Sequence, residues 1–154
     1  MRKRSQKSSH YWKKDLGMLE EELKFLSDVG CGYLPHSGRT LYDHLLGTAN
    51  ILLEYERPDA EVKAGLFHSI YGTDIYRLSK SISITREAVS EVIGEEAEQL
   101  VHIFCSLKPR IEKIINGDVD KKYIDNLRWI EYANIKEQNN NSRNLIPLRI
   151  LLGL

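Results

Sequence analysis

Apolar residues recur every three or four positions along most of this chain, which is the spacing of one face of an α-helix. Leu16, Leu19, Leu23 and Leu26 follow this pattern, and no long stretch alternates between apolar and polar residues as a half-buried strand does. The predicted helices cover residues 15–29, 40–55, 60–69, 85–93, 95–107, 120–138 and 145–152. We therefore expect an all-α fold, a bundle of about six or seven helices with less than about 5% strand.

The length and the charge of the chain limit its organisation and its partners. Its 154 residues, of which 42% are hydrophobic, suit one domain with a single core. Residues 1–14 form a basic, polar leader that we expect to be flexible, and residues 15–154 form the domain. Lys plus Arg and Asp plus Glu both total 22. No net charge therefore attracts nucleic acid or an anionic membrane, and we expect neither as a partner.

The apolar segments and the cysteines indicate the cellular compartment in which we expect the protein. No apolar run approaches the roughly 20 residues of a membrane span, and none follows the basic leader as it would in a signal peptide. Cys31 and Cys105 do not have the C-x-x-C spacing of a metal site. Free thiols without an export signal predict a cytoplasmic protein with no membrane partner.

Polar residues occur where the helical pattern predicts burial. His44 and Thr48 lie four positions apart, on the face that also carries Leu45, and His68 ends the most apolar predicted helix. A buried polar group costs about 1–3 kcal/mol unless it is paired. Further polar residues stand near the ends of these helices: His36, Arg39, Ser69, Tyr71 and Thr73. The sequence therefore predicts a polar pocket, which is either a ligand site or a hydrogen-bonded network within the core.

The segments around the two central histidines resemble the HD phosphohydrolase superfamily. The local match is best to the hydrolase domain of RelA/SpoT-type alarmone enzymes, in which the first-histidine helix and the ALLHD and FGEEVAELV segments resemble residues 44–52, 64–69 and 93–101. Residues 36–48 and 65–73 also resemble the signatures HSxRTLxDHLxGT and GLFHSxYGT of a set of bacterial HD-like proteins. The resemblance implies an HD-type bundle, in which a histidine on one helix and a His-Asp pair ending the next bind a divalent metal.

The chain departs from that superfamily at its carboxylates. Ser69 stands in the place of the Asp of the His-Asp pair, and Asn134 stands in the place of the last metal-binding Asp. The acidic pair that serves alarmone hydrolysis falls at Gly72 and Thr73. Because neither residue can act as a general acid or base, we do not expect alarmone hydrolysis.

The resemblance assigns any bound metal to His44 and His68. The Asn134 oxygen is a weak ligand for hard cations, and Glu137, one helical turn further on, could supply the missing carboxylate. His36 could supply a third imidazole. Imidazole suits transition metals better than Mg or Ca, so the cofactor that we expect, if any, is Fe, Zn or Mn.

Three functions remain open at this stage. The first is a metal-dependent enzyme, a hydrolase or an oxygenase, that acts on a small phosphorylated or oxygenated metabolite. Arg39 would orient that substrate, although it could equally pair with Asp43 four residues on. The second is a small-molecule binding module that kept the pocket and lost the metal. The third is a structural or interaction protein on the same scaffold. The first two imply a small-molecule ligand.

Overall fold

The computed structural model describes residues 19–33, 35–36, 38–72 and 84–154. The predicted leader (1–14), the start of the first predicted helix and Thr73 lie outside the described residues. Within these ranges the chain forms eight α-helices: α2 (Glu20–Asp28), α3 (Leu41–Glu54), α4 (Asp59–Phe67), α6 (Arg86–Ile93), α7 (Glu95–Ser106), α8 (Arg110–Asn116), α9 (Ile124–Gln138) and α10 (Leu145–Leu152). The all-α prediction is confirmed. The helix that was not predicted is α8, which raises the count above six or seven.

Local chemistry explains where several helices begin. The Thr40 hydroxyl accepts a hydrogen bond from Asp43 N at 3.1 Å, and the Thr85 hydroxyl accepts one from Ala88 N at 3.0 Å. Both threonines therefore cap the first turn of a helix, α3 and α6 respectively. Pro147 is the third residue of α10, where a missing N–H costs no helical hydrogen bond.

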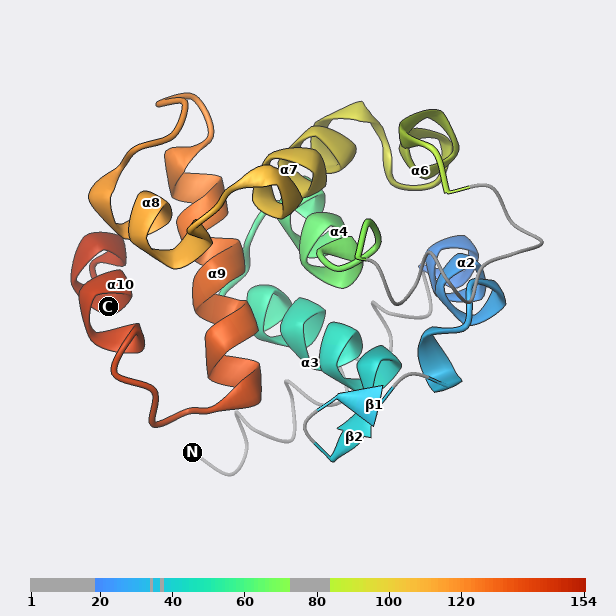
Figure 1. The fold of residues 1–154 in the computed structure, drawn as a ribbon, viewed down its shortest axis with the longest axis horizontal. Coiled ribbons are helices and arrows are strands. Elements are labelled where there is room, and N and C mark those ends of the chain that lie inside the picture. The colour runs from blue at the N-terminus through green and yellow to red at the C-terminus, as the bar shows by residue number, and fades with distance from the viewer. Residues whose placement is uncertain (1–18, 34, 37, 73–83) are drawn as a thin grey trace.

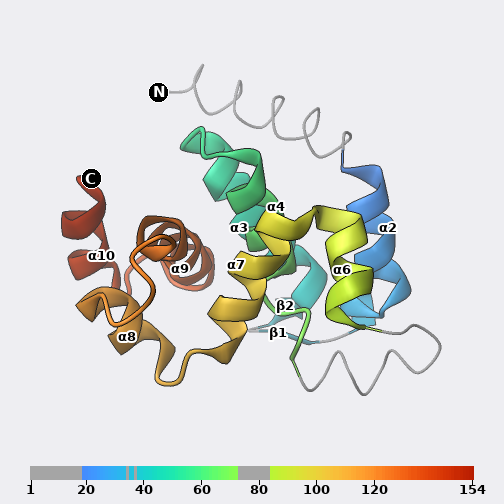
Figure 2. The same ribbon diagram turned by 90° about the horizontal axis from the view of Figure 1, so that it is seen from above.

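Helix α3 packs on both α4 and α9, and these three helices form the centre of the molecule (Figure 1). Helix α7 covers α4, whereas α10 and α8 pack on α9. Figure 2 shows α8 and α10 on one side of α9, with α2 and α6 at the opposite end of the molecule. None of the helices in the described ranges is long and apolar enough to cross a membrane.

A glycine allows α3 and α4 to approach each other closely. A Cβ atom at Gly65 on α4 would lie 2.5 Å from Leu52 Cδ1 on α3, and Leu52 is fully buried. The missing side chain therefore makes room for the leucine. Because the two helices lie so close together, His68 at the end of α4 comes near His44 on α3, with 5.1 Å between the two ring centroids.

A short hairpin precedes α3. Strands β1 (Pro35–His36) and β2 (Arg39–Thr40) are antiparallel, with His36 opposite Arg39. They are the only strands among the described residues. The hairpin holds His36 and Arg39 next to the first turns of α3, on which His44 lies.

The packing at the α3–α4 contact gives a stability prediction. Leu52→Ala removes a fully buried side chain and should lower the free energy of unfolding by about 2–5 kcal/mol, because it leaves a cavity between two close-packed helices. Ile150→Ala alters a side chain that is 74% exposed. It should change the free energy of unfolding by less than about 0.5 kcal/mol. Urea unfolding followed by circular dichroism measures both. Equal effects of the two substitutions would contradict this packing.

Candidate functional site

Helices α3, α4 and α9 bring three predicted site residues together inside the molecule. His44 is fully buried, and His68 and Asn134 are each 5% exposed. The rings of His44 and His68 meet edge to face, with an interplanar angle of 84°. These residues are far apart in the sequence, so their meeting depends on the packing of three helices.

Both ring nitrogens of His44 have an oxygen partner. Nδ1 lies 2.8 Å from Glu137 Oε1, and Nε2 lies 2.8 Å from Asn134 Oδ1. Glu137 also forms an ion pair with Arg39. The sequence had offered Asp43 as a partner of Arg39, but the partner in the structure is Glu137. Glu137 therefore holds the Nδ1 side of the ring, whereas Asn134 lies on its Nε2 side.

His68 is held from one side only. Its Nδ1 donates to the carbonyl oxygen of Gly65 at 2.7 Å. Burial, followed by the charge of His44, lowers the pKa of His68 to about 3, so the imidazole is neutral near pH 7. With the proton on Nδ1, a lone pair remains on Nε2, and that atom has no hydrogen-bond partner among the described residues.

The Asn134 amide is oriented by a buried carboxylate. Its Nδ2 donates to Glu131 Oε1 at 2.9 Å, which fixes Oδ1 on the side of His44. The other Glu131 oxygen accepts from Arg110 Nε at 2.6 Å. Together with the contacts of His44, these bonds form a continuous chain, which runs Arg110, Glu131, Asn134, His44, Glu137, Arg39. We call it the polar chain.

Next to the polar chain lies a cavity of about 390 Å³. Its lining residues are His36, His44, His68, Ser69, Tyr71, Gly72, Phe104, Cys105, Lys108, Arg110, Asn134 and Gln138. Six predicted site residues are therefore among the lining. Arg39 and Glu137 are not, because they lie behind His44, and Thr48 is not, because its hydroxyl donates to His44 O at 2.9 Å. Thr73 lies outside the described residues.

Several residues of the site were missed in the sequence. Glu131 carried a signal, because a charged residue at a core-facing position of α9 between Leu127 and Asn134 must have a partner. Lys108 and Arg110 flank a helix-ending proline and resemble ordinary surface cations. Cys105 gave no signal; its thiol donates to His68 O at 3.0 Å, and burial raises its pKa to about 11.

His36 extends over the polar chain from the hairpin. Its ring stacks on that of His44 with centroids 4.4 Å apart, and its Nε2 lies 2.6 Å from Gln138 Nε2. Because the amide nitrogen can only donate, His36 Nε2 is the acceptor. Burial lowers the pKa of His36, and the charges of His44 and Arg39 lower it further. His36 is therefore a neutral ring that covers His44.

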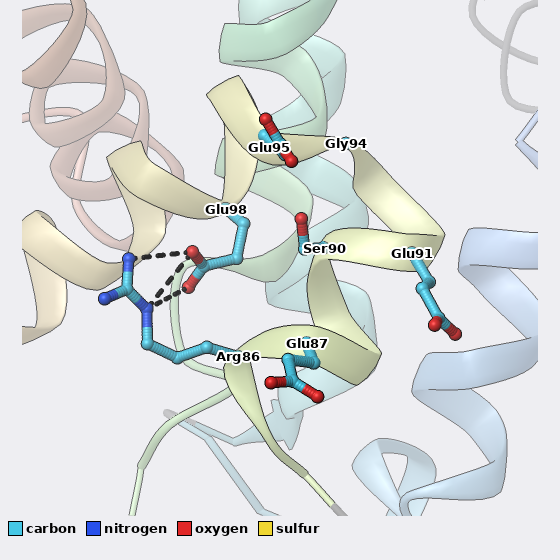
Figure 3. Close-up of a pocket in the computed structure, with 7 residues that line it drawn as sticks. All are labelled: Arg86, Glu87, Ser90, Glu91, Gly94, Glu95 and Glu98. Atoms are coloured by element: carbon cyan, nitrogen blue, oxygen red, sulfur yellow. Dashed lines mark hydrogen bonds and ion pairs between the residues drawn. The ribbon is translucent and has the colours of Figure 1, made fainter.

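Tyr71 is turned toward a second polar cluster, at the junction of α6 and α7. Its hydroxyl donates to Glu98 Oε2 at 2.7 Å, and Arg86 donates to both Glu98 oxygens, at 3.0 Å and 2.9 Å (Figure 3). Burial, together with the Glu98 carboxylate, raises the pKa of Tyr71. The groove in Figure 3 contains mostly acidic residues of the two helices, and Glu98 joins it to the wall of the histidine cavity.

A metal would have to be held by an unusual set of side chains. In the part of the chain that the structure describes, no three His, Cys, Asp or Glu side chains are arranged to hold a metal ion. Glu131 and Glu137 are not among the lining residues. The potential ligands nearest to His44 and His68 in the lining are the Asn134 oxygen, the Ser69 hydroxyl and the Cys105 thiol. The cavity can therefore offer a metal two imidazole nitrogens and the Asn134 oxygen.

The neutral state of His68 predicts a pH dependence of stability. Because its pKa is about 3 when folded and 6.5 ordinarily, the unfolded chain binds one more proton between these values. The corresponding stabilisation is complete above about pH 6.5 and is lost as the pH falls toward 3, by up to about 1.4 kcal/mol per pH unit. His68→Gln, which keeps a donor for Gly65 O, should lose this part of the slope. Urea unfolding of metal-free protein at several pH values tests it, and equal slopes for both proteins would contradict it.

Comparison with known proteins adds a family to this geometry. No curated protein and no solved structure matches the chain. A family model described as "Domain of unknown function (DUF6817)" matches residues 25–109. This range holds the hairpin, both central histidines and Lys108, and it ends before Arg110 and α9. Because the match covers more than half of the chain, the protein belongs to the DUF6817 family.

Proposed function

We propose that this protein is a metal-dependent enzyme that holds one divalent transition-metal ion with His44 Nε2, His68 Nε2 and Asn134 Oδ1. One observation carries the proposal: Nδ1 of each histidine is already bound to an acceptor, Glu137 Oε1 at 2.8 Å and Gly65 O at 2.7 Å. Metal-binding histidines almost always have such a partner on the second nitrogen, because it fixes the tautomer and orients the ring. The resemblance to the HD superfamily, which pairs two histidines in this way, points in the same direction.

Two carboxylates contact the side chains that would bind the metal, although the groups that line the cavity itself are neutral or cationic. Glu137 lies behind His44, and Glu131 lies behind Asn134, within 2.8 Å and 2.9 Å of their side chains. Such carboxylates raise the basicity of the ligands that they contact. Two imidazoles and one amide oxygen favour Zn or Fe over Mg or Ca, which prefer anionic oxygen ligands.

The size and the polar lining of the cavity support a small polar molecule as the substrate. A metal bound there would polarise a substrate oxygen or activate water, as in hydrolysis, or support oxygen chemistry. The protein would bind and orient the substrate between His36, Ser69 and Phe104, which line the cavity. His68 stays neutral because of its burial, so it is available as a ligand down to low pH.

The two contacts of His44 favour a second candidate, a binding module without a metal. Both His44 nitrogens lie 2.8 Å from an oxygen, and an imidazolium ring donates to both. In that state Glu137 would balance its charge, and the polar chain would be complete without a metal. The two candidates differ in one property, which is whether His44 Nε2 exchanges its proton for a metal ion.

Metal binding separates the two candidates. Protein purified without an affinity tag should contain about one equivalent of Zn or Fe, and calorimetric titration of stripped protein should restore it. His68→Ala should abolish binding, whereas His102→Ala, outside the cavity lining, should leave it intact. Wild-type protein that binds neither metal would leave the binding module as the function.

Restoring the carboxylate of the His-Asp pair should strengthen the site. Ser69 lines the cavity, so Ser69→Asp adds a negative charge where the HD superfamily has one. We expect metal affinity to rise at least about tenfold, with the largest gain for Mn, which prefers anionic oxygen. Ser27→Asp, an equal change of charge at an exposed position of α2 outside the cavity lining, is the control. Equal affinities in calorimetry for both variants would contradict the placement of the metal.

A further inference from the structure

The cavity lining has a one-sided charge. It contains Lys108, Arg110 and three imidazoles, and it contains no carboxylate side chain among the described residues. The carboxylates that contact lining residues are paired with arginines: Glu131 with Arg110, Glu137 with Arg39, and Glu98 with Arg86. A ligand at the Lys108 and Arg110 side of this cavity therefore faces two cationic side chains with no carboxylate of the lining beside them, which favours an anion.

Lys108 has no competing partner in the described structure. It lies on the connection between α7 and α8, it is exposed, and none of the ion pairs among the described residues involves it. It nevertheless lines the cavity beside His68 and Cys105. Lys108 is therefore an exposed cation in the wall of the cavity, with no ion-pair partner among the described residues.

Arg110 is the second cationic side chain in the cavity lining. Its Nε is used by Glu131, and its guanidinium carbon lies 4.4 Å from the centre of the Phe104 ring. These two contacts fix the plane of the group, while its two terminal nitrogens have no partner among the described residues. A planar guanidinium held in this way presents two parallel N–H donors, the geometry that binds a carboxylate or a phosphate.

We infer that Lys108 and Arg110 form a subsite for an oxyanion group, carboxylate or phosphate, on the small molecule that this protein acts on. The inference rests on the proposed function, since it assumes that the remainder of the bound ligand lies toward His68 and Asn134. A cavity of about 390 Å³ is at the small end of the range for small-molecule sites. The ligand is therefore a small anionic metabolite, and its charged end binds at the α7–α8 connection.

The test uses inorganic phosphate and acetate as probes of metal-free, nitrogen-15-labelled protein, with glycerol as the neutral probe. Amide signals of residues 104–110 should shift with both anions and should not shift with glycerol. Lys108→Met should weaken anion binding about tenfold, the loss of one charge-assisted hydrogen bond. Lys121→Met changes the net charge equally at an exposed position outside the lining and should leave the affinity unchanged.

The outcomes separate this subsite from the metal site. Equal affinities in the two lysine variants, or shifts that lie elsewhere in the protein, would overturn the subsite even if zinc binds as proposed. If anion binding depends on Lys108 but the protein does not bind zinc, the result would support the subsite and contradict the proposed metal site. Phosphate bound more tightly than acetate would indicate a phosphorylated ligand, and the reverse order a carboxylic acid.

Discussion

The structure depends on the pairing of a fully buried histidine. His44 lies on the central helix α3, and its two nitrogens contact Glu137 and Asn134, one turn apart on α9. An unpaired buried polar group would cost more than most single contacts in the core contribute, so the register between these helices is set by this histidine. Gly47 makes the pairing possible, because a Cβ atom there would lie 2.5 Å from Glu137 Oε2.

In the proposed metal site, carboxylates would act through the polar chain and would not bind the metal directly. The resemblance to the HD superfamily assigns Ser69 and Asn134 to positions of its aspartates, whereas Glu137 and Glu131 contact His44 and Asn134 through hydrogen bonds. Arg39 pairs with Glu137, and Arg110 pairs with Glu131. Each of these carboxylates is therefore held by an arginine while it contacts a residue of the proposed metal site.

Sequence patterns predicted the helices and the meeting of His44, His68 and Asn134, because periodicity reports which helix face is buried and the resemblance reports which helices meet. They missed α8, whose seven residues are too short for a periodic signal. They missed Lys108 and Arg110 because these depend on where a connection passes another helix. Thr48 was predicted to line the pocket from its helix face, but its hydroxyl donates to the carbonyl oxygen of His44 one turn earlier, and the helix face alone does not reveal this.

The central claim is that His44, His68 and Asn134 hold a transition metal. X-ray absorption at the zinc edge of the loaded protein tests it most directly, since it counts the atoms around the ion. The account predicts two imidazole nitrogens near about 2.0 Å, oxygen ligands at a similar distance, and no sulfur. Cys105 lies beside His68, so a sulfur neighbour at about 2.3 Å would contradict the ligand set. A shell of oxygen alone would contradict it as well.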